Sequence, residues 1–465
     1  MPHHTNRGQT LDMSDTANEY NQITDEERDP LIIQSNGVTR RKSLVKISSE
    51  KKEERLLSLD VVRGITIFTM NLVNHADGSY PILEHAVWDG LTLADFVMPF
   101  FLFIVGCSIV LSHNKLKKRS SRTDILKKSA VRTVKLIGLG LLLAAIGYIP
   151  NIDIYRFRLP GVLQRIAIGY FITVCIELFV PFLEISDERL ERGNGFVPPE
   201  SSRLYAVYYR LTRGPLKIVV TYGIQWLCAI FILLMYLILV FNVDVPNCGR
   251  GSLTPKCNAF SYIDQLIVRE HHMYQYPTCQ KLGCKPFDPE GLLSNMASVV
   301  SVIIGLYYGY VLVHVTRPKK ILMHWIFPSS LFLFSGLMIH FFGGFPLNKN
   351  LYSPSFLFLM AGAAGFFLSI FYLVVDVYRF KKIFMPFIWL GSNSIIIYFL
   401  DEAMPTVIGW FCYDGNDNNI IQQSQTWLKD HMGERHGIFF YAMSDTIFWT
   451  LVAGVLYYKK IFFKV

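Results

Sequence analysis

The sequence predicts an all-α protein built as a polytopic bundle of membrane-spanning helices, and three observations lead to this fold class. Of the 465 residues, 51% are hydrophobic and only 17% are charged, against roughly a quarter charged in a typical soluble domain. The apolar residues gather in runs without a polar face, such as residues 230–241, and helices of this kind lie in lipid or in a very large core. The basic residues bracket these runs, as membrane topology requires. This composition excludes a disordered chain, a disulfide-rich miniprotein and an ordinary soluble enzyme.

About ten runs are long enough to cross the hydrocarbon layer, which takes roughly 20 predominantly apolar residues in a helix. The expected spans lie near residues 57–75, 91–113, 129–149, 160–183, 216–241, 291–313, 322–342, 354–376, 383–402 and 437–458. The third run begins with Arg132 and Lys135. Because long basic side chains near a helix end can reach the headgroups, we keep this run as a span.

Lysine and arginine concentrate on one side of the predicted bundle. With ten spans, that side carries residues 39–55, 114–128, 314–321, 377–382 and the C-terminal YYKKIFFKV. The positive-inside rule assigns this side to the cytosol, so both termini are expected to be cytosolic. The net charge of +9 therefore reflects membrane topology and contact with lipid. No nucleic-acid partner is expected, because the basic residues do not alternate with aromatic residues on a soluble face.

The opposite side receives one long loop, residues 242–290. This loop contains four cysteines, namely Cys248, Cys257, Cys279 and Cys284. Four cysteines in one polar loop suit two disulfides in an oxidising lumen, with the pairing open. A zinc site is the alternative, but the spacings fit ordinary structural zinc poorly. We expect no metal.

Residues 1–55 are expected to form a disordered cytosolic tail, ahead of a transmembrane domain of residues 56–465. The tail is polar and lacks the apolar core of a signal peptide. Within it, the stretch EERDPLI (26–32) has an acidic residue four positions before Leu31-Ile32. This pattern resembles an acidic dileucine sorting signal, which indicates a lysosomal or vacuolar membrane.

Ionisable groups at membrane depth are costly, so they are functional candidates by default. Asp60 and Arg63 lie three residues apart on one face of the first span. They form a local ion pair, or a phosphate site in which Asp60 holds the guanidinium in place. The other candidates at or inside the spans are Gln164, Arg165, Asn393 and Glu290. Glu290 begins the sixth span, where an acid can also simply complement the helix dipole.

Polar residues concentrate at the luminal mouth between the first two spans, including Trp88. His85 is either a structural residue or a catalyst whose ring is oriented by nearby carboxylates. Asp95 is either a hydrogen-bonding group between helices or the residue that orients His85. Asn74 ends the first span, where its amide could donate a hydrogen bond to a developing oxyanion.

Five stretches resemble, in order, the heparan-α-glucosaminide N-acetyltransferase family of lysosomal transmembrane enzymes. They are residues 58–106, 158–171, 262–279, 287–309 and 390–400. The resemblance runs from about Leu57 to the C-terminus. It implies transfer of an acetyl group from cytosolic acetyl-CoA, as co-substrate, to the amine of a terminal glucosamine in the lumen, and it implies a homodimer. The animal enzyme has a luminal N-terminal domain and one further span before the shared core, and we expect a cytosolic tail in their place here.

The resemblance places the family's implicated histidine on His85, within EHAVWDG, and its implicated asparagine on Asn74. We expect acetyl-CoA to bind near residues of the first, fourth and ninth spans, namely Asp60, Arg63, Gln164, Arg165 and Asn393. We expect the acceptor to contact Trp88, Asp95 and Glu290. Direct transfer and an acetyl-histidine intermediate both remain open. An acyltransferase for another luminal acceptor and a non-catalytic transporter are the alternatives.

Overall fold

The computed structural model describes residues 56–117, 120–147, 155, 157–180, 216–274, 282–283, 287–411 and 419–463. The chain divides into Met1–Glu54 and Arg55–Val465, and everything below concerns the second unit. The expected tail with its dileucine pattern lies outside the described residues, as do Cys279 and Cys284.

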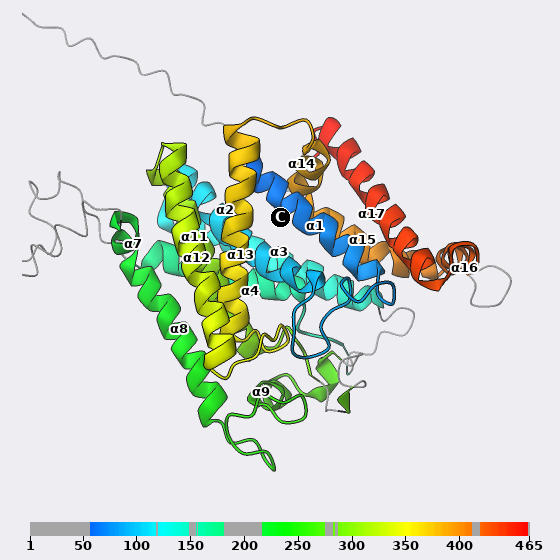
Figure 1. Cartoon of the computed structure of the whole chain (residues 1–465), viewed down its shortest axis with the longest axis horizontal. Helices are drawn as coiled ribbons and strands as arrows, with labels where there is room; N and C mark the ends of the chain where they lie inside the picture. The colour runs from blue at the N-terminus through cyan, green and yellow to red at the C-terminus, as the bar shows by residue number, and fades with distance from the viewer. Residues whose placement is uncertain are drawn as a thin grey trace, which may run out of the picture. The chain divides into compact units, whose positions relative to one another are not determined.

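Helices make up the fold, and the described residues contain no strand beyond two isolated bridges. The principal helices are α1 (Leu57–His75), α2 (Val97–Lys117), α3 (Arg122–Gly147), α4 (Val162–Phe179), α8 (Gly223–Asn242), α11 (Leu292–His314), α12 (Pro318–Phe342), α13 (Pro354–Phe371), α14 (Met385–Ser392), α15 (Ser394–Gly409) and α17 (Glu434–Tyr458). The shorter ones are η1 (Leu93–Phe96), α7 (Lys217–Thr221), α9 (Ala259–Ile267), η3 (Glu270–His272), η4 (Tyr372–Val377) and α16 (Ile420–Met432). The all-α prediction is confirmed (Figure 1).

Eight helices of the described chain are long and apolar enough to cross a membrane, and each coincides with an expected span. The other two expected spans differ for physical reasons. Helix α1 carries Asp60 and Arg63 within its 19 residues, which lowers its hydropathy. The run 383–402 is interrupted at Asn393, which separates α14 from α15.

Helix α11 packs against α2, α4, α8 and α13. The apolar stretch of α11 is 83% buried within the protein, whereas that of α3 is only 17% buried. The crossing of α2 and α11 is close because both helices have glycine there. A Cβ atom on Gly106 would lie 2.0 Å from the carbonyl oxygen of Val302, and one on Gly305 would lie 2.1 Å from that of Phe103.

Three loops cover one end of the helices. They follow α1, α8 and α12, and hydrogen bonds connect them. The Trp88 indole donates to the carbonyl of Leu253 at 3.1 Å, and the Gly90 amide donates to the carbonyl of Leu347 at 2.9 Å. Cys248 and Cys257 form a disulfide in the second loop, which confirms one pair among the four cysteines of the expected luminal loop. The candidate site lies beneath this layer.

Candidate active site

A cavity of about 130 Å³ lies between α1, α2, α4 and α15, at the end of the bundle covered by the loops. Its wall is mostly apolar. The carboxylate, imidazole, ammonium and amide groups that reach it belong to Asn74, His85, Glu290, Lys349 and Glu402. The structure therefore brings three predicted site residues into one cavity and adds two that sequence reasoning missed. We refer to it as the histidine cavity.

His85 is held by Asp95. The Nδ1 atom of His85 lies 3.0 Å from Oδ1 of Asp95, and the side chain of Asp95 is fully buried whereas that of His85 is 50% exposed. The other oxygen of Asp95 accepts hydrogen bonds from the backbone amide and the hydroxyl of Thr92 at 3.0 and 2.9 Å. An ionised carboxylate fixed in this way favours the tautomer with a proton on Nδ1, which leaves a lone pair on Nε2. Of the two alternatives for Asp95, the structure shows the contact with His85, and Nε2 can act as a base or a nucleophile. Contact of Asp95 with an acceptor stays a prediction.

Lys349 approaches the same imidazole from the loop that follows α12. Its Nζ atom lies 2.9 Å from Nδ1 and 3.3 Å from Nε2 of His85, and 3.6 Å from Oδ1 of Asp95. Burial lowers the pKa of Lys349, and the carboxylates of Asp95 and Glu290 oppose this shift. No pattern in the sequence around Lys349 marks this position, because only the packing of the loop brings it to the histidine.

Asn74 faces Glu402 across the histidine cavity. The side-chain amide of Asn74 donates to Oε1 of Glu402 at 2.6 Å. An amide nitrogen carries two protons, and the second has no partner among the described residues, so it can serve an oxyanion. Glu402 had a sequence signal that was missed. Adjacent acids, Asp401 and Glu402, interrupt an otherwise apolar span, and acids at that depth mark functional sites.

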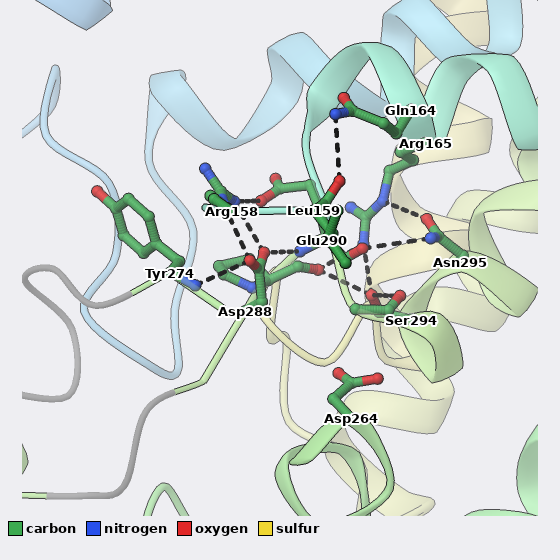
Figure 2. A network of polar contacts seen from close by, with 12 residues as sticks. Arg158, Leu159, Gln164, Arg165, Asp264, Tyr274, Asp288, Glu290, Ser294 and Asn295 are labelled. Atoms are coloured by element: carbon green, nitrogen blue, oxygen red, sulfur yellow. Dashed lines mark hydrogen bonds and ion pairs between the residues drawn. The ribbon is translucent and has the colours of Figure 1, made fainter. Parts of the chain in front are cut away.

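A network of ion pairs borders the histidine cavity on the loop side (Figure 2). The Arg158 guanidinium binds both oxygens of Asp288 at 2.9 and 2.8 Å and Oε2 of Glu290 at 2.7 Å. It also lies 4.5 Å from the centre of the Tyr274 ring. Burial opposes the ionisation of Glu290, but the surrounding cations, chiefly Arg158, outweigh it and hold the pKa of Glu290 at about 2. Glu290 is therefore an anion that faces the cavity, in addition to any favourable interaction with the helix dipole.

Two residues that were predicted to bind acetyl-CoA make contacts between different parts of the bundle. The Arg165 side chain is buried and donates to Asn295 on α11 at 2.9 Å (Figure 2). Asn393 donates to the carbonyl of Ile461 at 3.1 Å and accepts from the amide of Phe463 at 3.2 Å, which secures the segment after α17. Their role in binding acetyl-CoA stays a prediction.

Two further predicted residues lie beside the histidine cavity. Gln164 donates to the carbonyl of Leu159 at 3.2 Å and lines an adjoining cavity. Trp88 is buried at 7% exposure against Phe287 and is not among the residues that line the histidine cavity. Its contact with an acceptor stays a prediction.

A second cavity, of about 350 Å³, adjoins the first and lies nearer to the start of α1. The two cavities share four apolar lining residues, namely Phe101, Leu136, Ile166 and Ile395. Arg63 and Arg132 line the second cavity, which we call the arginine cavity. Along α1, the eleven residues from Arg63 to Asn74 correspond to a rise of about 16 Å.

Contacts with Asp60, Ser108 and Gly391 hold Arg63 at the wall of the arginine cavity. Its guanidinium lies 3.3 Å from Oδ1 of Asp60, and it donates to the Ser108 hydroxyl at 2.8 Å and to the Gly391 carbonyl at 3.2 Å. The last contact requires glycine at position 391, because a Cβ atom there would lie 1.9 Å from the carbonyl oxygen of Asp60. The predicted ion pair of Asp60 and Arg63 is confirmed.

A third cavity, of about 600 Å³, adjoins the histidine cavity on the side of the ion-pair network. Arg158, Gln164 and Tyr274 line it. It shares four residues with the histidine cavity, namely Val162, Leu163, Tyr398 and Glu402. We call it the outer cavity. The histidine cavity therefore lies between two larger ones and is adjacent to both.

The chain is similar to known proteins over the segment that forms most of this site. Residues 55–188, which include Arg63, Asn74, His85 and Asp95, match the family model described as heparan-alpha-glucosaminide N-acetyltransferase, catalytic. The chain is 32% identical over 434 residues to heparan-alpha-glucosaminide N-acetyltransferase of Homo sapiens, covering 88% of this chain and 60% of that protein. It is 30% identical over 463 residues to the Mus musculus protein of the same name, covering 94% of this chain and 63% of that protein.

The chain thus spans about three fifths of the length of these curated relatives. The similarity still extends over most of this chain, and it includes the segment that contributes Asn74, His85 and Asp95 to the site. This multi-pass, all-α membrane protein is therefore similar over most of its length to heparan-alpha-glucosaminide N-acetyltransferases.

Proposed function

We propose that this protein transfers the acetyl group of cytosolic acetyl-CoA to the amine of a luminal terminal glucosamine, as on heparan sulfate. The observation that carries the proposal is the row of three adjoining cavities, with His85 in the middle one. A donor and an acceptor that enter from opposite sides of a membrane can meet only in such an arrangement. The names of the curated relatives support the same reaction.

Acetyl-CoA enters through the arginine cavity. Its phosphates are anionic, and Arg63 and Arg132 are the cations that line this cavity. Basic residues flank this end of the spans, which supports a cytosolic position for the cavity, on the side where both termini are expected. The pantetheine arm is thin and only moderately polar, so it can extend past the four shared apolar residues. The thioester then lies beside His85.

The acceptor enters through the outer cavity. Its protonated amine is attracted by carboxylates, and Glu290 and Glu402 both reach the histidine cavity. Because only a neutral amine can attack the thioester, a base has to take its proton. The lone pair on Nε2 of His85 suits this task, since Asp95 binds the other ring nitrogen.

The acetyl group can be transferred by either of two routes. In direct transfer, the amine nitrogen bonds to the acetyl carbon, His85 Nε2 takes the amine proton, the carbon–sulfur bond breaks and the CoA sulfur receives that proton. In the covalent route, Nε2 bonds to the acetyl carbon as the carbon–sulfur bond breaks and CoA leaves as the thiolate. The neutral amine then bonds to the acetyl carbon, the bond to Nε2 breaks, and the freed Nε2 takes the amine proton. In both routes Asn74 donates to the oxyanion of the tetrahedral intermediate.

The remaining expectations complete the proposal. We place the protein in a lysosomal or vacuolar membrane, with the loop that contains Cys248 and Cys257 in the lumen. The disulfide supports an oxidising compartment on that side. A homodimer is expected from the family resemblance.

Acetylation by the purified full-length chain tests the proposal. The chain is incubated in detergent with acetyl-CoA and glucosamine-ended oligosaccharides, and the products are identified by mass spectrometry. We expect an N-acetylated product from the wild type and none from His85→Ala, which should retain the thermal shift that acetyl-CoA produces. His431→Ala, in an exposed part of α16, is the matched control and should retain activity.

The other outcomes identify the alternatives. If acetyl-CoA does not change the melting temperature of the wild type, the acetyltransferase proposal fails and a transporter is favoured. If acetyl-CoA binds and another amine or hydroxyl is acetylated, the acceptor is wrong. Rapid quench with labelled acetyl-CoA and no acceptor separates the two routes, because only the covalent route leaves label on His85.

A further inference from the structure

A second cluster of ionisable groups lies behind the histidine cavity, where α1, α15 and α17 meet. It consists of His75, Asp401 and Asp445. We propose that these three side chains bind a divalent metal ion of the zinc or manganese type. The inference stands on the geometry and charge of the cluster and does not depend on the proposed acetyl transfer.

The distances match a coordination sphere. Nε2 of His75 lies 3.3 Å from Oδ1 of Asp401 and 3.5 Å from Oδ2 of Asp445. One ligand atom from each of the three side chains lies within 4.8 Å of the others. Ligand atoms bound to tetrahedral zinc at about 2.0–2.2 Å are separated from one another by about 3.3–3.6 Å. One imidazole and two carboxylates with an open fourth position also form a donor set that zinc accepts.

One oxygen of each carboxylate lacks a hydrogen-bond donor. The side chain of Asp401 is fully buried, and its Oδ2 atom has no hydrogen-bond partner among the described residues. Oδ2 of Asp445 is likewise buried without a hydrogen-bond donor in the described part of the chain. Buried polar atoms are nearly always satisfied, so two such oxygens beside one histidine indicate a missing partner.

The charge of the region gives a second and independent argument. Asp401, Asp445 and the adjacent Glu402 contribute up to three negative charges, and His75 contributes at most one positive charge. Within the described residues, no lysine or arginine forms an ion pair with these carboxylates. Buried charges need compensation. A divalent cation supplies it and at the same time satisfies the two oxygens without donors.

The cluster is also accessible to an ion. His75 and Asp445 are 17% and 18% exposed, so one side of the cluster is open while Asp401 forms its closed base. His75 is the last residue of α1, at the point where the chain leaves the helix. No metal was expected from the spacing of the cysteines, and these three ligands come from three separate helices, with 326 residues between His75 and Asp401.

A metal ion at this cluster would position two side chains that line the histidine cavity. His75 follows Asn74 directly, and Asp401 precedes Glu402 directly. The two neighbours meet through the 2.6 Å hydrogen bond across the cavity. An ion that links α1 and α15 would therefore hold Asn74 and Glu402 in register without touching a substrate.

Metal analysis of the full-length protein tests the site. The chain is purified in detergent without chelators or a histidine tag, and its metal content is measured by inductively coupled plasma mass spectrometry. We expect about one zinc or manganese ion per chain. Asp445→Asn and His75→Gln should reduce this content about tenfold, because each removes one of three ligands. Asp77→Asn, an exposed acid two residues after His75, is the matched control and should leave it unchanged.

A second measurement covers variants that fail to fold. Wild-type protein stripped with a chelator should melt at a lower temperature, and ZnCl₂ or MnCl₂ alone should restore it. A wild type that contains no stoichiometric metal and gains no stability from either ion overturns the site. Asp401 and Asp445 would then share a proton. Unchanged metal content in both ligand variants would also overturn it, because the metal would be bound elsewhere.

Discussion

Nζ of Lys349 lies 2.9 Å from Nδ1 of His85, although 264 residues separate them in the chain. An ammonium group can only donate, whereas the pairing with Asp95 requires Nδ1 to carry a proton. Lys349 and Asp95 therefore compete for the same ring nitrogen. The balance between them decides which nitrogen of His85 has the lone pair that faces a substrate.

Lys349→Met should alter the pH dependence of the reaction more than its maximal rate. The ammonium lies beside both the imidazole of His85 and the carboxylate of Asp95, so its removal changes the charge around the ring. The pH–activity profile of Lys349→Met should therefore differ from that of the wild type. Lys349→Arg retains the charge and should retain the profile. Identical profiles for wild type and Lys349→Met would show that the ammonium does not act on His85.

Asp95→Asn should reduce kcat by about 10- to 100-fold, because an amide can donate to Nδ1 and so favour the wrong tautomer. The KM for acetyl-CoA should change little, since Asp95 is fully buried behind the histidine. Steady-state kinetics at several pH values measure both constants. Asp89→Asn changes an acid of the same loop that contacts Asn348 instead and serves as the control. An increase in KM with an unchanged kcat would instead assign Asp95 to substrate binding.

Asp264 predicts how stability depends on pH. Burial raises its pKa from 3.8 to about 7, against the opposing hydrogen bond from the Leu292 amide. Between about pH 4 and pH 7 the carboxyl of Asp264 holds a proton in the folded protein that the unfolded chain releases. The contribution of this proton to the free energy of unfolding is therefore full below about pH 4 and is lost as the pH rises to about 7. The shift of about three pKa units sets an upper bound of about 4 kcal/mol.

The expected result is a higher melting temperature at pH 5 than at pH 7.5. Asp264→Asn resembles the protonated side chain, so it should reduce this difference and stabilise the protein at pH 7.5. Asp244→Asn, an exposed acid near the start of the loop after α8, should leave the difference intact. If the wild type and Asp264→Asn show the same dependence on pH, Asp264 is already ionised in the folded protein.

The disulfide predicts both stability and topology. Cys248→Ser with Cys257→Ser opens a loop with a sequence separation of 9, and a crosslink of that size contributes about 2–3 kcal/mol. The double variant should melt several degrees lower.

In sealed vesicles that contain the wild type, a membrane-impermeant maleimide should label Cys248 and Cys257 only after reduction and only from the luminal side. Labelling from the cytosolic side would reverse the proposed orientation.

Most of the fold could be predicted because lipid leaves few alternatives. Long apolar runs have to form helices in a bilayer, and eight of the expected spans coincide with described helices that are long and apolar enough to cross it. The break at Asn393 could not be predicted in the same way. Its side chain satisfies the backbone of Ile461 and Phe463, and these contacts exist only once α17 has packed.

In the site, too, contacts between residues close in the sequence could be predicted and contacts between distant residues could not. His85 and Asp95 are only ten residues apart, so their pairing could be predicted from one short stretch. Lys349 arrives from a distant loop, and the partner of Glu290 is Arg158, 132 residues away. Pairings of this kind depend on tertiary packing, and a single sequence contains no signal for them.

The passage between the arginine and histidine cavities gives the last prediction. Ile395 lines both cavities, so Ile395→Trp should fill the connection and stop the pantetheine arm short of His85. We expect acetyl transfer to fall by at least about 100-fold, because reacting atoms held out of contact lose their proximity. The nucleotide end should still bind the arginine cavity, which ADP or desulfo-CoA binding by thermal shift would show. Ile395→Leu keeps the volume and should keep the activity. Full transfer by a folded Ile395→Trp protein would mean that the donor reaches His85 by another path.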